Sequence, residues 1–69
     1  MPVTELGLTG GERLRVEGRP AEVEAAILSA ARGSLMEFAW MIEAGSGQRV
    51  GVNPEHVLTL RAVEPGPEG

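Results

Sequence analysis

The sequence predicts an α+β domain in which a single antiparallel sheet, with the order ββαβββ along the chain, carries one helix packed on one face. Three observations support this fold class: two alternating apolar runs near the start, a helical pattern after them, and a strand-rich stretch over residues 36–63. Residues 1–63 form the predicted domain. Residues 64–69, which contain only Glu, Pro and Gly, form a predicted disordered tail.

The first two strands are predicted to form a hairpin. Residues 3–8 contain a broken apolar alternation, whereas residues 12–17 alternate cleanly, with Leu14 and Val16 on one face and two arginines on the other. The Gly10-Gly11 pair between the two runs suits a tight turn, because glycine adopts the backbone angles that hairpin turns need.

Residues 20–32 are predicted to form the helix. Pro20 suits the first helical position, and Glu22 lies in the first turn, where the helix dipole favours an acid. The apolar residues that recur at helical spacing on one face are Val23, Ala26, Ile27, Ala30 and Ala31. Because this face is mostly alanine, the helix can approach a sheet closely.

The next strand carries the heaviest apolar side chains of the chain. The set that alternation places on one face is Met36, Phe38, Trp40 and Ile42, and the opposite set includes Leu35, Ala39 and Met41. We expect the first set to lie under the helix, with Trp40 in the core. The alternative is a register shifted by one residue, which would turn Trp40 toward solvent or a partner, where it would act as a binding hot spot.

The remaining stretch predicts a turn, a strand, a break and a last strand. Residues 44–47 are the turn, and in the strand over residues 48–52 two valines face alike. Asn53 is expected to cap a short helical turn that Pro54 starts. Residues 57–63 are the last strand.

The sheet face away from the helix is the predicted functional surface. It is too apolar to be fully exposed and too charged for a second core, so either the sheet curls into a half-barrel or this face meets another subunit. The candidate binding residues on it are Arg13, Arg15, Met41, Arg49 and Arg61. The arginines have two interpretations: cross-strand pairs with glutamates such as Glu37 and Glu43, or a patch that binds phosphate or an acidic partner.

Composition argues against several classes of function. The net charge of −4 disfavours a general affinity for nucleic acid. His56 is the only histidine, and with no Asp or Cys in the chain it cannot complete a hydrolytic triad, so we expect no enzyme activity, no cofactor and no metal. No secretory signal and no apolar run of membrane-spanning length are present, so the expected location is cytoplasmic.

Parts of the sequence resemble two known families. Residues 20–27, PAEVEAAI, and residues 47–52, GQRVGV, resemble the helix and strand pair of an uncharacterised family of very small actinobacterial proteins, which implies a strand–helix–strand fold and no assigned activity. Residues 47–57 also look like the N-terminal hairpin of FlbD-type proteins, which are associated with flagellar gene regulation. Residues 8–27 look like their C-terminal hairpin and helix, in reversed order.

The leading functional prediction is a small non-enzymatic protein-interaction module that forms a homodimer or higher oligomer through the open sheet face. The alternative is an anion-binding or nucleic-acid-binding regulator that uses the arginine-bearing face.

Overall fold

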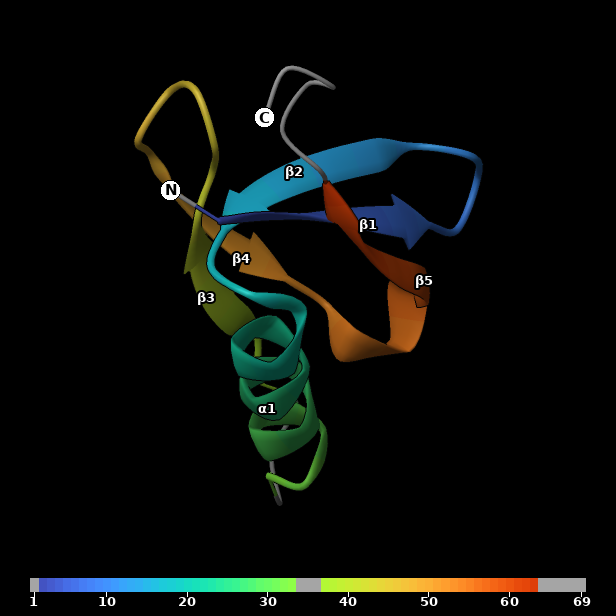
Figure 1. The fold of residues 1–69 in the computed structure, drawn as a ribbon. Helices are drawn as coiled ribbons and strands as arrows, with labels where there is room; N and C mark the ends of the chain where they lie inside the picture. Colours follow the sequence, from blue (N-terminus) through green and yellow to red (C-terminus); the bar gives the residue numbers. More distant parts are fainter. Residues whose placement is uncertain (1, 34–36, 64–69) are drawn as a thin grey trace.

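The computed structural model describes residues 2–33 and 37–63, and it has the predicted α+β class, with one helix and antiparallel strands. In chain order the elements are β1 (Val3–Leu8), β2 (Arg13–Glu17), α1 (Pro20–Ala31), β3 (Ala39–Ile42), β4 (Arg49–Val52), the 3-10 helix η1 (Pro54–His56) and β5 (Val57–Val63) (Figure 1). The predictions for Leu35, Met36 and the tail at residues 64–69 fall outside the described residues.

The strands form two sheets, so the prediction of a single sheet is wrong. The first sheet has the order β2-β1-β5, and the second contains β3 and β4. The sheets meet at an isolated bridge between Val16 and Glu43, and the Ala44 N–H donates to the Arg15 carbonyl oxygen at 2.8 Å. Within the described residues, pairing between β2 and β3 is limited to this bridge.

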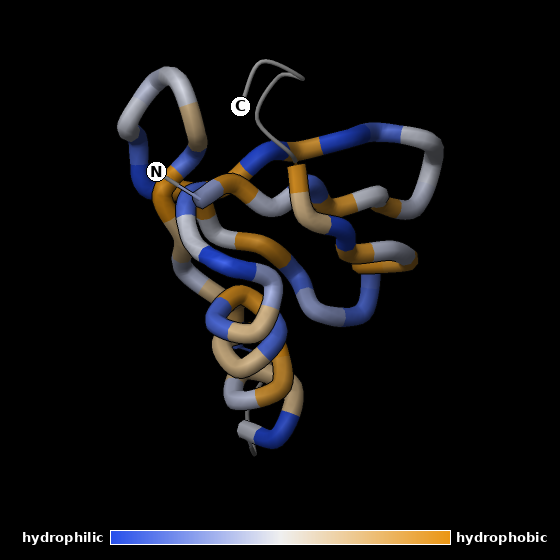
Figure 2. Tube along the Cα trace, viewed as in Figure 1, coloured by the Kyte–Doolittle hydropathy of each residue, from blue (hydrophilic) through white to orange (hydrophobic). Residues whose placement is uncertain are grey.

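The core lies between the two sheets and the helix. Its buried apolar side chains are Leu6, Val16, Val23, Ala30, Ala39, Met41 and Val52. Figure 2 shows apolar residues on strands of both sheets and on α1, which lies below the strands in this view and packs against β3, η1 and β5. All seven side chains are aliphatic, so the aromatic residues contribute nothing to the buried core.

The register of β3 is the reverse of the predicted one. Ala39 and Met41 are buried, at 3% and 8% exposure, whereas Phe38 and Trp40 are 54% and 57% exposed. The reason is the size of the space under the helix. The helix packs on β3 with the short side chains of Val23, Ala26 and Ala30, and close packing against these suits the small Ala39 and the flexible Met41 better than two aromatic rings. The register of β4 is as predicted, with Val52 buried.

Local contacts fix the start of the helix. The Thr4 hydroxyl, which is fully buried, donates to the Gly18 carbonyl oxygen at 2.9 Å. Gly18 has φ 122°, a conformation that favours glycine and turns the chain from β2 into α1. The Arg19 N–H then donates to the Glu22 carboxylate at 3.0 Å, which satisfies a free amide at the helix start. The helix ends at Ala31, one residue before the predicted end.

The break before the last strand is as predicted. The Asn53 side-chain oxygen accepts a hydrogen bond from the Glu55 N–H at 2.9 Å, and Pro54 begins η1. This turn leads directly into β5, which pairs with β1. The cap therefore links the second sheet to the first.

Candidate interaction surface

The aromatic residues of the chain lie on its surface. Phe38 and Trp40 are its only aromatic residues, and each is more than half exposed. Their rings are in edge-to-face contact, with centroids 6.2 Å apart and an interplanar angle of 68°. Both lie on the outer face of the second sheet, since the residues that alternate with them, Ala39 and Met41, face the core. An exposed aromatic pair is the kind of surface that gains most from being covered.

The Trp40 ring is held from two sides. The Arg49 guanidinium carbon lies 4.9 Å from the centroid of the Trp40 ring, which is a cation–π contact. Gly51 is the cross-strand partner of Trp40, and a Cβ atom at Gly51 would lie 3.1 Å from the indole Cη2. The indole therefore leans across onto β4 and covers the Gly51 backbone. We call Phe38, Trp40 and Arg49, with Gly51 beneath them, the aromatic cluster.

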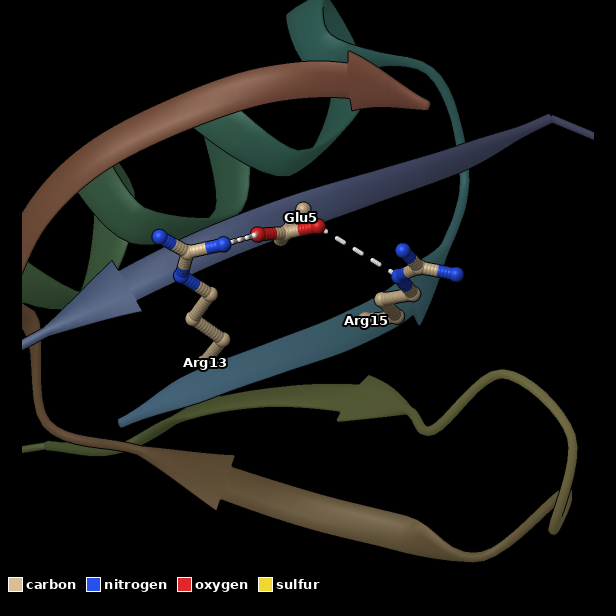
Figure 3. Close-up of polar contacts among 3 residues, drawn as sticks. All are labelled: Glu5, Arg13 and Arg15. Carbon is tan, nitrogen blue, oxygen red and sulfur yellow. Dashed lines mark hydrogen bonds and ion pairs between the residues drawn. The ribbon is translucent and has the colours of Figure 1, made fainter. Parts of the chain in front are cut away.

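The outer face of the first sheet is charged instead. Glu5 on β1 lies between two arginines of β2 (Figure 3). Arg13 Nη1 is 3.6 Å from Glu5 Oε2, and Arg15 Nε is 3.3 Å from Glu5 Oε1. Arg13 and Arg15 therefore pair with Glu5, and not with Glu37 or Glu43, the glutamates that were expected to be their partners. Since both arginine side chains are largely exposed, each pair contributes at most about 1 kcal/mol.

Arg61 extends this charged face. It is the cross-strand neighbour of Glu5 on β5, opposite the side where Arg15 lies, and it is exposed. Two arginines thus contact the Glu5 carboxylate, and a third lies on the neighbouring strand of the same outer face. We call Glu5, Arg13, Arg15 and Arg61 the charged face.

The structure separates the five predicted binding residues into three groups. Arg13, Arg15 and Arg61 lie together on the charged face, whereas Arg49 lies on the other sheet, against Trp40. Met41 is buried in the core, so its placement on an open face is wrong. The shift of the β3 register explains this error, because it exchanges Met41 with Trp40. A signal for the exchange was present in the small Ala39, which suits the alanine-rich helix.

The lone histidine contributes to the fold. His56 is exposed in η1, where its Nδ1 lies 3.4 Å from the Thr9 hydroxyl, and the Thr9 N–H donates to the His56 carbonyl oxygen at 2.8 Å. Over residues 2–33 and 37–63, no three side chains of the types that bind metals come together. Within the same ranges, no helix is long and apolar enough to cross a membrane.

Comparisons with known proteins return no match, whether against protein-family models, curated proteins or solved structures. The family resemblances of residues 20–27 and 47–57 therefore stay predictions. A function must therefore be inferred from the surface of the chain itself. The aromatic cluster and the charged face are the two candidate binding surfaces.

Proposed function

We propose that this chain is a small non-enzymatic protein-interaction module that associates with copies of itself through the aromatic cluster. One observation supports this function most: both aromatic side chains are more than half exposed and lie side by side on one face. Tryptophan and arginine are also the residue types that concentrate binding energy at the centres of interfaces. Because Arg49 and Gly51 already hold the Trp40 ring, covering it costs little side-chain entropy.

The small core favours a second copy as the partner. A chain of 69 residues buries only about 60% of its unfolded surface, and this one has no cysteine and therefore no disulfide. Its core is aliphatic, so the largest apolar side chains add nothing to it. Burying the exposed halves of Phe38 and Trp40 against another copy adds roughly 1–2 kcal/mol for each ring. Self-association thus supplies the burial that the isolated fold lacks.

The test is the solution mass as a function of concentration, measured by sedimentation. Wild type should exceed the mass of one chain at high micromolar concentration, and Trp40→Ala should have the mass of one chain. Leu58→Ala is the matched control, because Leu58 on β5 is 68% exposed and lies outside the aromatic cluster. This variant should associate like wild type. A wild-type mass of one chain at high micromolar concentration, or equal losses in both variants, would contradict the proposal.

Anion binding by the charged face is a second candidate function. It is supported by Arg13 and Arg15, which share the carboxylate of Glu5, and by Arg61, which lies opposite Glu5 on β5, so arginines gather on one face of a chain with a net charge of −4. Guanidinium groups bind phosphate and carboxylate groups with paired hydrogen bonds. A triple change to alanine at Arg13, Arg15 and Arg61 should abolish salt-sensitive binding of a polyanion such as heparin, and Arg49→Ala should not. Absence of wild-type binding at low salt would exclude this function.

A further inference from the structure

The outer edge of β4 is open within the described part of the chain, since β4 pairs there with β3 alone. The Glu43 N–H donates to the Gln48 carbonyl oxygen at 2.8 Å, so these two residues form a hydrogen-bonded pair of the β3–β4 ladder. Hydrogen-bonded pairs alternate along an antiparallel ladder. Val50 and Val52 therefore direct their backbone groups toward β3.

The residues between them direct their backbone groups the other way. By the same alternation, the N–H and C=O groups of Arg49, Gly51 and Asn53 point to the open edge. The Asn53 carbonyl already accepts the His56 N–H at 3.0 Å, so the free groups end there. The open edge of β4 is thus a short row of free backbone N–H and C=O groups centred on Gly51, directly beside the aromatic cluster.

We propose that two copies of the chain pair their β4 strands antiparallel across a two-fold axis at Gly51, which joins the two second sheets into one sheet with the order β3-β4-β4-β3. This inference rests on the proposed function, because it specifies how the copies associate. The Gly51 N–H of each copy donates to the Gly51 carbonyl of the other. The Asn53 N–H of each copy donates to the Arg49 carbonyl of the other.

The side chains of β4 favour a two-fold axis at Gly51 over one at the adjacent residue, Val50. A two-fold axis at Gly51 sets Arg49 opposite Asn53 of the second copy, and Val50 opposite Val52, so no like charges meet and apolar side chains face each other. An axis at Val50 would set Gln48 opposite the buried Val52. It would also bring Arg49 against Gly51 of the second copy, whose outer side Trp40 already covers.

The aromatic cluster is completed by this pairing. The two β3 strands lie about 14 Å apart in a sheet with this order, since neighbouring strands are spaced by about 4.8 Å. Each Trp40 leans over its own Gly51 toward the axis, and neither glycine has a side chain to keep the rings apart. The two indoles therefore approach each other over the paired glycines, and each covers the exposed surface of the other.

Amide hydrogen exchange of the wild-type protein tests the pairing. The Gly51 and Asn53 amides should exchange rapidly in a dilute, monomeric sample and at least about tenfold more slowly in a concentrated one. The Val50 and Val52 amides should be protected at both concentrations, because they bond to β3 in either state. An oligomer by mass whose Gly51 amide exchange does not slow would overturn the β4 pairing and leave self-association intact. A chain that stays monomeric would overturn both.

Cysteine cross-linking tests the register independently, since the chain has no native cysteine. Arg49→Cys mixed with Asn53→Cys should form a covalent dimer on mild oxidation, because hydrogen-bonded partners place their Cα atoms about 5.5 Å apart. Either variant alone should cross-link at least about tenfold more slowly, since its two cysteines then lie several residues apart along the paired strands. Equal cross-linking in all three samples, or preferential cross-linking of Asn53→Cys with Arg61→Cys on β5, would overturn this register.

Discussion

The outer faces of the two sheets differ in how far their side chains find partners within the chain. On the first sheet, Glu5 accepts from Arg13 and Arg15 within the same chain, so much of the charge is already compensated. On the second sheet, Phe38 and Trp40 contact each other, yet more than half of each side chain remains in water. The charges of the first sheet have partners on the neighbouring strand, whereas the rings of the second sheet stay largely exposed within the described structure. The aromatic cluster is therefore the face that gains more from contact with a partner.

The largest expected effect is the difference in stability between alanine substitutions on the two sides of β3. Met41→Ala should lower the free energy of unfolding by roughly 2–4 kcal/mol, because it leaves a cavity in the core. Trp40→Ala should change the stability of the dilute monomer by less than about 1 kcal/mol, because the indole is exposed there. Urea unfolding at low concentration measures both. Equal losses would mean that the two sides of β3 do not differ as described.

Two glycines, one on each outer face, provide a matched pair. Alanine at Gly51 would place its Cβ against Trp40, and alanine at Gly7 would place its Cβ against the Thr59 hydroxyl. We expect Gly51→Ala to displace the indole and weaken self-association by at least about tenfold, since hot-spot residues carry most of the energy of an interface. Gly7→Ala should cost about 1 kcal/mol of stability through a forced rotamer of Thr59 and leave association unchanged. Sedimentation and tryptophan fluorescence distinguish the two outcomes.

The smallest expected effect concerns Glu5. Glu5→Gln removes the negative charge shared by Arg13 and Arg15, and because both pairs are at the surface, the loss of stability should be less than about 1 kcal/mol in low salt. The same change frees two guanidinium groups, so binding of a polyanion should become stronger if the charged face binds anions. Thermal unfolding at low and high salt, with a heparin titration, measures both effects. A loss of self-association in this variant would contradict the separation of the two faces.

Local signals in the sequence predicted most elements. The hairpin of β1 and β2, the helix that Pro20 begins, and the turn that Asn53 caps are all set by neighbours in the chain. The β3 register was not predictable in this way. Both of its alternating sets are apolar, so alternation alone carries no information about which side faces inward. The small space left by the alanines of the helix decides it, and this is a property of the assembled fold.

The grouping of the candidate binding residues could not be predicted from local sequence either. The alternation of Arg13 and Arg15 showed that they face outward together, but their shared partner Glu5 depends on strand pairing. Arg49 was expected beside them, and the division into two sheets places it against Trp40 instead. Which arginines form one surface was therefore decided by tertiary structure.

The central place of β1 in the first sheet has a consequence for how the chain folds. β1 pairs with β5 from Leu8 opposite Val57 to Val3 opposite Val63, so this pairing must close a loop of about 50 residues before it gains its first contact. Leu6, one of the most deeply buried side chains, lies within this pairing, opposite Leu60. The local hairpins can form early, but the core becomes enclosed only when the two distant strands meet. We therefore expect the β1–β5 pairing to set the folding rate.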